Sequence, residues 1–219
     1  DRDGDVAADA FLALHALLER HYPATHRTLT RERVGRFSLL YTWPGGDPAL
    51  PAMVLMAHQD VVPIAPGSEG DWQADPFGGE IRDGFVWGRG AWDDKGNLVA
   101  QMEAIEALAA AGFKPRRTLY LVFGHDEEIG GLQGAATIVA RLKSAGVKVG
   151  MVVDEGMLVT EGILKGLTPP AALVGLAEKG YLTVTLTAQA APGHASMPGP
   201  RNAVGTLAAA ITRLEAHPM

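Results

Sequence analysis

Apolar residues along the first 153 positions recur with two spacings, one typical of helices and one typical of buried strands. The helical spacing predicts helices over residues 7–21, 95–111 and 132–145. Short apolar runs bounded by Gly, Pro or acids predict strands over residues 36–43, 52–57, 118–123 and 147–153. An Asp83-Gly84 turn signal adds a small hairpin over residues 80–87. This alternation predicts an α/β fold with a mostly parallel sheet flanked by helices.

The pattern changes after the segment Glu178-Lys179-Gly180. Residues Tyr181 to Ala188 alternate polar and apolar side chains, which predicts a strand with one face in water. The polar loop PGHASMPGP follows, and a helix is predicted from Asn202 to Ala216. We therefore expect a first domain over residues 1–177 and the start of a smaller α+β domain over 178–219. If the strand at 181–188 has no neighbour, its open edge favours aggregation.

Composition narrows the class of protein. The 219 residues are 47% hydrophobic and 20% charged, which is typical of a soluble globular protein, and the net charge of −6 disfavours nucleic acid as a partner. The absence of cysteine excludes disulfides, thiolate metal sites and cysteine nucleophiles. No apolar stretch is long enough to span a membrane, and the first residues do not have the pattern expected of a signal peptide. Both ends look truncated, so no compartment is assigned.

Acidic residues and one histidine lie where the predicted strands give way to loops. Because ligands gather at the carboxyl ends of parallel strands, we expect these side chains to meet at one edge of the sheet. Clustered carboxylates repel one another and resist desolvation unless cations hold them together. The sequence therefore predicts a metal site. Its candidate residues are His58, Asp60, Asp93, Glu127, Glu128 and Asp154.

His58 and Asp60 are two residues apart, so on a strand they share one face. This spacing suits a zinc-ligating imidazole whose second nitrogen is held by a carboxylate, by a water or by a backbone contact. Taken alone the HQD motif is weak evidence, because short motifs match often by chance.

Glu127 and Glu128 are adjacent acids, so their side chains point in different directions. One can bind a cation while the other acts as a general base toward a water. The alternative is an acidic first turn of the following helix, favoured by the helix dipole. That alternative does not explain Gly130-Gly131, which permits a tight backbone turn beside the acids.

Asp93 and Asp94 follow the glycine-rich segment GRG and precede a predicted helix. A phosphate-binding loop is the alternative, but the segment fits neither phosphate-binding fingerprint, and two acids at a helix start repel phosphate. Asp93 is better suited to bridging two cations, and Asp94 to capping the helix. Of Asp154 and Glu155, either can be a ligand; Asp154 is preferred because it lies nearer the strand end. A plain turn acid is the alternative for both.

The other histidines give no comparable signal. His125 can face the acids or point away from them, and the rest lie on the first helix, in a loop and near the C-terminal end. They are His15, His21, His26 and His217. No nucleophilic serine motif is found.

Six segments occur in a fixed order between residues 57 and 198: AHQDVVP, WGRGAWDDKG, GHDEEIGG, VVDEG, AEKGY and GHASMP. Together they resemble the M20 family of dinuclear zinc peptidases and amidohydrolases, and most closely its carboxypeptidase S and N-acyl-amino-acid hydrolase branch. The resemblance implies a pair of zinc ions with Asp93 bridging them. It further implies that His58, Glu128 and Asp154 complete the ligand set.

The resemblance also implies roles around that pair of ions. Asp60 would orient His58, and Glu127 would be the general base. His194 would reach the active site of a neighbouring subunit and polarise the scissile carbonyl, which implies a homodimer formed through the second domain. The peptide bond between Asp93 and Asp94 is expected to be cis.

The function implied is metal-dependent hydrolysis of an amide bond in a small peptide or N-acyl amino acid. Family members take a last histidine ligand from a C-terminal stretch, and after His194 only His217 is a histidine. That stretch is therefore expected to lie outside the chain. The alternatives are a non-catalytic metal-binding fragment or scaffold, and, within enzymes, a desuccinylase or an aminopeptidase.

Overall fold

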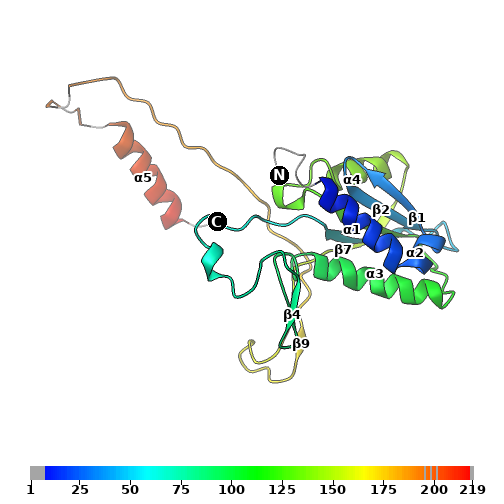
Figure 1. Ribbon diagram of the computed structural model, residues 1–219. Coiled ribbons are helices and arrows are strands. Elements are labelled where there is room, and N and C mark those ends of the chain that lie inside the picture. Colours follow the sequence, from blue (N-terminus) through cyan, green and yellow to red (C-terminus); the bar gives the residue numbers. More distant parts are fainter. Residues whose placement is uncertain (1–7, 195, 198, 201, 218–219) are drawn as a thin grey trace. The chain divides into compact units, whose positions relative to one another are not determined.

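The computed structural model in Figure 1 describes residues 8–194, 196–197, 199–200 and 202–217. Residue 7 of the first predicted helix and residues 195 and 198 of the GHASMP segment therefore lie outside the described residues. The chain divides into two compact units, Asp1–Leu158 and Val159–Met219. The functional division expected at residue 178 stays a prediction.

A five-stranded sheet forms the centre of the first unit, in the order β1-β2-β6-β3-β7. Strand β3 pairs in parallel with β6 and β7, whereas β2 pairs antiparallel with β1 and β6. Strands β1, β3, β6 and β7 therefore run in one direction and β2 runs against them, which confirms the mostly parallel α/β prediction. The strands are β1 (Thr30–Val34), β2 (Ser38–Trp43), β3 (Ala52–His58), β6 (Leu119–Gly124) and β7 (Val149–Val153).

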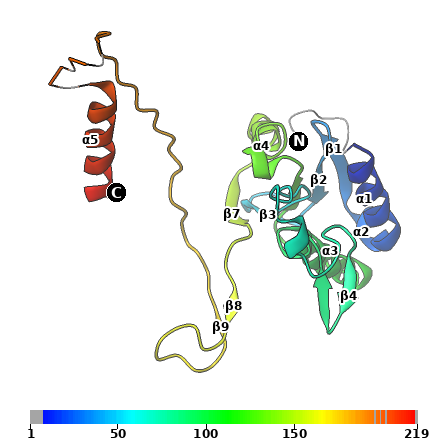
Figure 2. The same cartoon turned by 60° about the vertical axis from the view of Figure 1, so that its left-hand side comes forward.

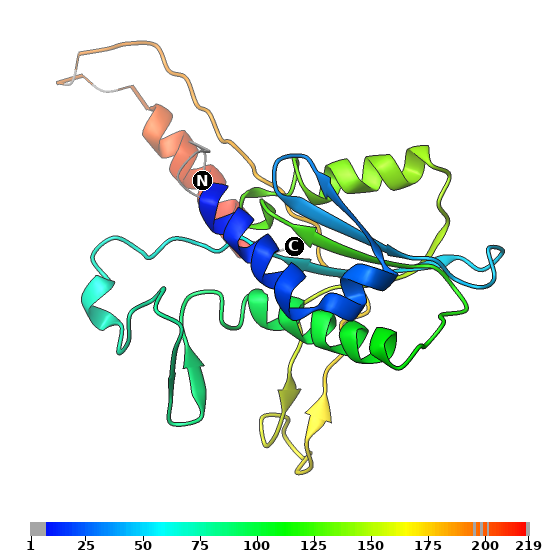
Figure 3. The ribbon, with the colours of Figure 1, turned by 45° about the vertical axis from the view of Figure 1, so that its right-hand side comes forward.

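Helices cover both faces of this sheet (Figures 2 and 3). Alternate residues of β6 show the division, because Leu121 and Phe123 pack with Leu18 of α1 and Met102 of α3, whereas Val122 packs on the other face against Ile138 of α4. The helices are α1 (Ala8–His21), α2 (Pro23–Thr28), α3 (Lys95–Ala110) and α4 (Ala135–Ser144).

The predicted hairpin is confirmed as β4 (Glu80–Arg82) and β5 (Phe85–Trp87), which pair antiparallel. Asp83 and Gly84 at its tip have φ angles of 54° and 81°, the left-handed pair that a tight two-residue turn requires. A single 3₁₀ turn, Glu69–Asp71, lies in the preceding loop.

Strand β1 and helix α2 were not predicted. The β1 sequence TRERV is mostly charged and lies at the edge of the sheet, where charged side chains face water and give no apolar alternation. Helix α4 begins at Ala135 rather than at residue 132, because the preceding residues form a loop around Asp126.

The second unit contains strands β8 (Val159–Thr160) and β9 (Ala171–Ala172), which pair with each other, and helix α5 (Ala203–Ala216). The predicted helix is confirmed, and Asn202 caps it by accepting a hydrogen bond from the Gly205 N–H at 2.7 Å.

The prediction of a strand over residues 181–188 is wrong, and the expected open strand edge falls with it. The side chain of Tyr181 is 95% exposed, and the neighbouring apolar residues are exposed as well. An alternating segment becomes a strand only where a neighbour bonds its backbone and covers its apolar face, and residues 181–188 pair with no described strand. Within the residues that the structure describes, no helix combines the length and apolar content that crossing a bilayer requires.

Candidate metal centre

The His58 side chain lies at the end of β3 and is only 3% exposed. Its Nδ1 faces Asp60, at 3.1 Å from the backbone oxygen and 3.4 Å from Oδ1. Its Nε2 faces three carboxylates from other parts of the chain. The distances are 2.9 Å to Asp93 Oδ1, 3.4 Å to Glu155 Oε1 and 3.9 Å to Glu127 Oε2.

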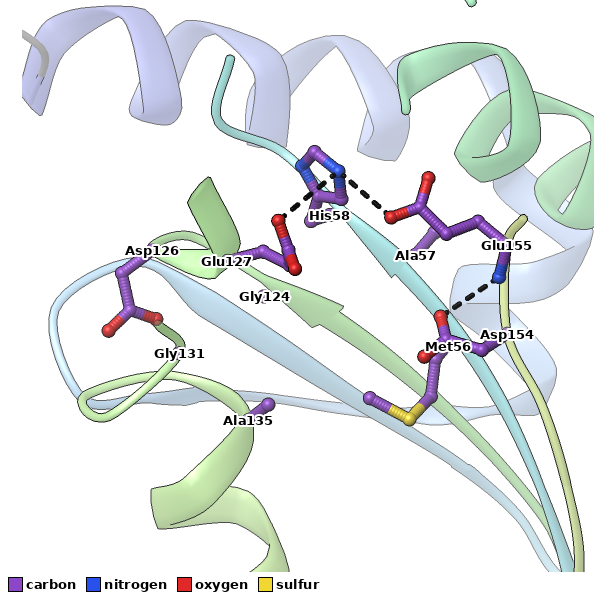
Figure 4. Close-up of a pocket in the computed structure, with 10 residues that line it drawn as sticks. All are labelled: Met56, Ala57, His58, Gly124, Asp126, Glu127, Gly131, Ala135, Asp154 and Glu155. Atoms are coloured by element: carbon purple, nitrogen blue, oxygen red, sulfur yellow. Dashed lines mark hydrogen bonds and ion pairs between the residues drawn. The ribbon is translucent and has the colours of Figure 1, made fainter. Parts of the chain in front are cut away.

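His58, Glu127 and Glu155 border a cavity of about 50 Å³ at the carboxyl end of the sheet. In Figure 4, Glu127 and Glu155 approach His58 from opposite sides. The residues that line the cavity are Met56, Ala57, His58, Gly124, Asp126, Glu127, Gly131, Ala135, Asp154 and Glu155.

Among the residues that the structure describes, two overlapping groups of side chains could hold a metal ion, and His58 belongs to both. One group adds Asp93 and Glu155, the other adds Glu127 and Glu128, and in each the ligand atoms lie within 4.8 Å of one another. An imidazole combined with carboxylates is a donor set that Zn²⁺ accepts. The residues present therefore fit zinc.

Electrostatics at the site favour a cation. Burial alone lowers the pKa of His58, but contact with Asp60 and the negative charge of Glu155 outweigh it and raise the pKa to about 10. Burial and repulsion from Asp94 raise the pKa of Glu155 to about 7. Lys95 and the protonated His58 contribute positive charge near the acids, but the acids outnumber them, which leaves an excess of negative charge for a metal ion to offset.

Asp60 connects His58 to the acidic pair. Its Oδ1 accepts a hydrogen bond from the Glu127 N–H at 3.2 Å, and its Oδ2 accepts one from the Glu128 N–H at 3.0 Å. Burial opposes ionisation of Asp60, yet the hydrogen bonds with His58 and the Glu128 N–H lower its pKa. The spacing of His58 and Asp60 predicted their contact, but no sequence pattern indicated that Asp60 also bonds the backbone of Glu127 and Glu128.

The acidic pair lies in a short 3₁₀ turn, Glu127–Ile129, and not in α4, so the alternative of an acidic first turn of that helix does not hold. The buried Asp126 organises the loop, because its Oδ2 accepts the Gln133 N–H and its backbone oxygen accepts the Gly131 N–H, each at 2.7 Å. Gly130 and Gly131 have φ angles of 101° and 65°, which glycine adopts without a side-chain clash.

Asp93 and Asp94 are joined by a cis peptide bond, as expected. Asp93 faces His58 Nε2, whereas Asp94 is 1% exposed and lies beneath the histidine. Asp94 occupies the N-cap position of α3, but the expectation that its side chain caps the helix is wrong. Its Oδ2 instead accepts a hydrogen bond from the His58 N–H at 3.0 Å and one from Asn97 Nδ2 at 3.4 Å.

Glu155, rather than the preferred Asp154, comes within reach of His58. Both acids line the cavity, but Asp154 Oδ1 accepts the backbone N–H of Glu155 at 3.0 Å, and Asp154 belongs to neither group of clustered ligands (Figure 4). Asp154, the first residue after β7, thus bonds the local backbone and Glu155, the second, projects toward His58, while the preference for Asp154 as a ligand stays a prediction.

Two histidines singled out in the sequence lie elsewhere. His125 is buried, with its Nδ1 2.6 Å from Ser38 Oγ and its ring edge-on to Phe11 and Phe37, so it belongs to the core. His194 is exposed in the second unit, where its Nδ1 is 2.8 Å from Ser196 Oγ. Its assigned role stays a prediction.

The sequence matches the model of peptidase family M20/M25/M40 over residues 54–218. It is 46% identical over 191 residues to the N-fatty-acyl-amino acid synthase/hydrolase PM20D1 of Xenopus tropicalis, covering 87% of this chain and 37% of that protein. It is 39% identical over 213 residues to carboxypeptidase S of Saccharomyces cerevisiae, covering 95% of this chain and 36% of that protein. The chain thus spans less than half the length of these curated relatives.

Solved structures share the fold at lower identity. The M20 family metallo-carboxypeptidase Sso-CP2 from Sulfolobus solfataricus has a TM-score of 0.55 and 21% identity, with 71% of this chain and 33% of that chain covered. Human carnosine dipeptidase 1 has a TM-score of 0.54 and 20% identity, with 72% and 40% covered. The family match spans most of the chain and includes every residue that lines the cavity. The chain therefore belongs to peptidase family M20/M25/M40.

Proposed function

We propose that the protein is a zinc-dependent hydrolase that cleaves the amide bond of a small peptide or an N-acyl amino acid, with Glu127 as general base. The observation that carries the proposal is the convergence of Asp93, Glu127 and Glu155 on the Nε2 face of a buried His58. The substrate class is supported by the names of the relatives, one an N-fatty-acyl-amino acid synthase/hydrolase and one a carboxypeptidase.

The ligands that we assign to a zinc pair are His58, a bridging Asp93, Glu128 and one acid of the Asp154–Glu155 pair. The family resemblance favours Asp154, whereas the 3.4 Å distance to His58 Nε2 favours Glu155. When bound, zinc supplies Lewis acidity toward the amide carbonyl and toward water.

Glu127 is suited to moving protons. Its backbone is fixed by Asp60, and its carboxylate is half exposed at the cavity, 3.9 Å from His58 Nε2. Burial, helped by the negative charge of Glu128 and only partly opposed by His58, raises its pKa toward the working range of a general base. Glu127 takes a proton from the attacking water and returns it to the leaving amine nitrogen.

Residues 178–219 are proposed as the start of a domain that pairs two subunits. In a homodimer of this kind, His194 of one subunit donates a hydrogen bond to the oxygen of the scissile carbonyl in the other. Such a donor stabilises the negative charge that develops on that oxygen.

The test compares Glu127→Gln with its neighbour Glu128→Gln in the full chain after reconstitution with zinc. The substrates are N-acyl amino acids, succinylated diamino acids and peptides with a free amine. We expect Glu127→Gln to lower hydrolysis by about 100-fold or more at unchanged zinc content, and Glu128→Gln to lose zinc together with activity. Substantial activity in Glu127→Gln contradicts the base assignment. A zinc-loaded protein that cleaves none of the substrates indicates a binding or scaffold role instead.

A further inference from the structure

A buried hydrogen-bond chain lies behind His58, on the opposite side of the strand end. Side chains alternate along a strand, so Gln59 faces away from His58 and Asp60. Gln59 is 2% exposed, and its amide side chain contacts His15 of α1 together with the backbone of Phe37 and Phe123. Neither His15 nor Gln59 has a part in the proposed chemistry.

Each hydrogen bond of the Gln59 side chain has one possible donor and one possible acceptor. Gln59 Nε2 donates to the Phe37 oxygen at 2.9 Å and to the Phe123 oxygen at 2.8 Å, which uses both amide hydrogens. Gln59 Oε1 is left to accept, and it lies 2.8 Å from His15 Nε2. His15 must therefore carry its hydrogen on Nε2. Burial lowers the pKa of His15 despite the contact with Gln59, which agrees with a neutral ring that donates from this atom.

These hydrogen bonds of Gln59 and His15 connect the end of β3 to three separate elements. The backbone N–H of Gln59 donates to the Gly124 oxygen at 2.8 Å, directly before the acidic loop, and the side chain bonds β6 through Phe123. Phe37 lies in the turn between β1 and β2, and His15 lies in the middle of α1. Gln59, which lies between His58 and Asp60, is thus hydrogen-bonded through both its backbone and its side chain.

We propose that His15 and Gln59 are positioning residues that hold the end of β3 so that His58 and Asp60 face the metal site. The part of this proposal that concerns metal rests on the proposed function. Removing the His15 donor leaves a buried oxygen of Gln59 without a partner, and an unsatisfied buried acceptor drives the side chain and its backbone to move. Partners that orient a ligand in this indirect way affect metal affinity by about 10-fold or more.

The experiment compares His15→Leu with His15→Gln, which keeps a donor, and with Leu14→Ala as the matched control. Leu14 precedes His15 on α1 and packs against the core. Each variant is measured by thermal unfolding, by competition for Zn²⁺ against a chromophoric chelator, and by hydrogen exchange at the Gln59 amide in zinc-free protein.

We expect His15→Leu to weaken zinc binding by about tenfold and to speed exchange at Gln59 beyond the change in global stability, with His15→Gln restoring much of both. Leu14→Ala should lower stability without either effect. Equal changes in His15→Leu and Leu14→Ala, once corrected for stability, overturn the proposal. If the unaltered protein binds no zinc, the proposed function fails, and Gln59 exchange alone decides whether His15 holds the strand end.

Discussion

The Asp94 carboxylate accepts the backbone N–H of His58 at 3.0 Å, which joins the start of α3 to the end of β3 beside the imidazole of the proposed metal site. The adjacent Asp93 faces the other side of the same histidine, 2.9 Å from Nε2. Two neighbouring acids thus make different contacts, Asp94 with the backbone of His58 and Asp93 with the face of the imidazole where we propose that a metal binds.

This difference predicts opposite effects in two neighbouring variants. Asp94→Ala leaves the buried His58 N–H without an acceptor, so we expect a loss of about 1–3 kcal/mol in the free energy of unfolding of the zinc-free protein. Asp93→Ala, at a half-exposed side chain, should leave that free energy nearly unchanged and abolish high-affinity zinc binding. Denaturant unfolding and zinc titration separate the two effects, and a larger stability loss in Asp93→Ala contradicts the assignment.

Asp60 should hold in place both the His58 side chain and the turn that carries Glu127 and Glu128. Removing its carboxylate in Asp60→Ala frees the Glu127 and Glu128 amides, so we expect faster hydrogen exchange at both and a loss of about 10–100-fold in zinc affinity. Asp60→Asn keeps one carbonyl oxygen as an acceptor and should lie between Ala and the unaltered protein. Unchanged exchange at both amides in Asp60→Ala is the result that contradicts this prediction.

The choice between the two acids that follow β7 can be decided by a pair of isosteric variants. Glu155 Oε1 lies 3.4 Å from His58 Nε2, whereas Asp154 bonds the local backbone. We expect Glu155→Gln to weaken zinc binding at least about tenfold more than Asp154→Asn, because a ligand matters more than the partners that orient it. The reverse order assigns the ligand to Asp154.

Glu106 gives the protein a pH-dependent contribution to stability that lies away from the metal site. Its carboxylate accepts the N–H groups of Ala24 and Thr25 at 2.8 and 2.7 Å, at the start of α2, and the Thr25 hydroxyl at 2.8 Å. Burial is the largest single influence on the pKa of Glu106 and raises it, but the three hydrogen bonds together outweigh burial and lower the pKa below its ordinary value of 4.5. The stabilisation is therefore fully present above pH 4.5 and is lost as the pH falls through the lower pKa of the folded protein.

Glu106→Gln should accordingly lower the free energy of unfolding by about 1–2 kcal/mol at pH 7, and this loss should shrink as the pH falls below 4.5. Glu103→Gln is the matched control, because Glu103 lies on the same helix and accepts the Tyr22 hydroxyl at 3.0 Å without capping α2. At pH 7, Glu103→Gln should lower the free energy of unfolding by less than Glu106→Gln does. Denaturant unfolding at pH 7 and pH 4 measures both variants, and a Glu106→Gln cost that is equal at the two pH values contradicts the prediction.

Strong apolar patterns made most of the first unit predictable. Strands β3 and β6 are short apolar runs buried on both faces, and such runs have few alternatives. Strand β1 could not be found this way, because its charged residues form an edge strand only through pairing with β2. Residues 181–188 show the converse, since a perfect alternation forms no strand without a neighbour among the described residues.

The site was predictable to the level of residue type and position, but not of orientation. The order of predicted strands and loops indicated that the acids meet at one edge of the sheet, and the structure brings Asp93, Glu127 and Glu128 to His58. Which of two adjacent acids projects inward depends on backbone turns that no local pattern encodes. Several partners of Asp94 and Gln59 lie far away in sequence, such as His58, 36 residues from Asp94, and His15, 44 residues from Gln59.

Strands β3, β6 and β7 are adjacent, run in the same direction and end at one edge of the sheet, where His58 is the last residue of β3 and the segments after β6 and β7 carry Glu127 and Glu155. The scaffold and the chemistry are therefore encoded in separate stretches of sequence, since the core residues lie within the strands and the reactive groups lie at or just beyond their ends. Loops can be exchanged between relatives while the strands stay fixed. For protein engineering, this makes the segments after these three strands the natural units of transplantation when a new substrate preference is sought on the same framework.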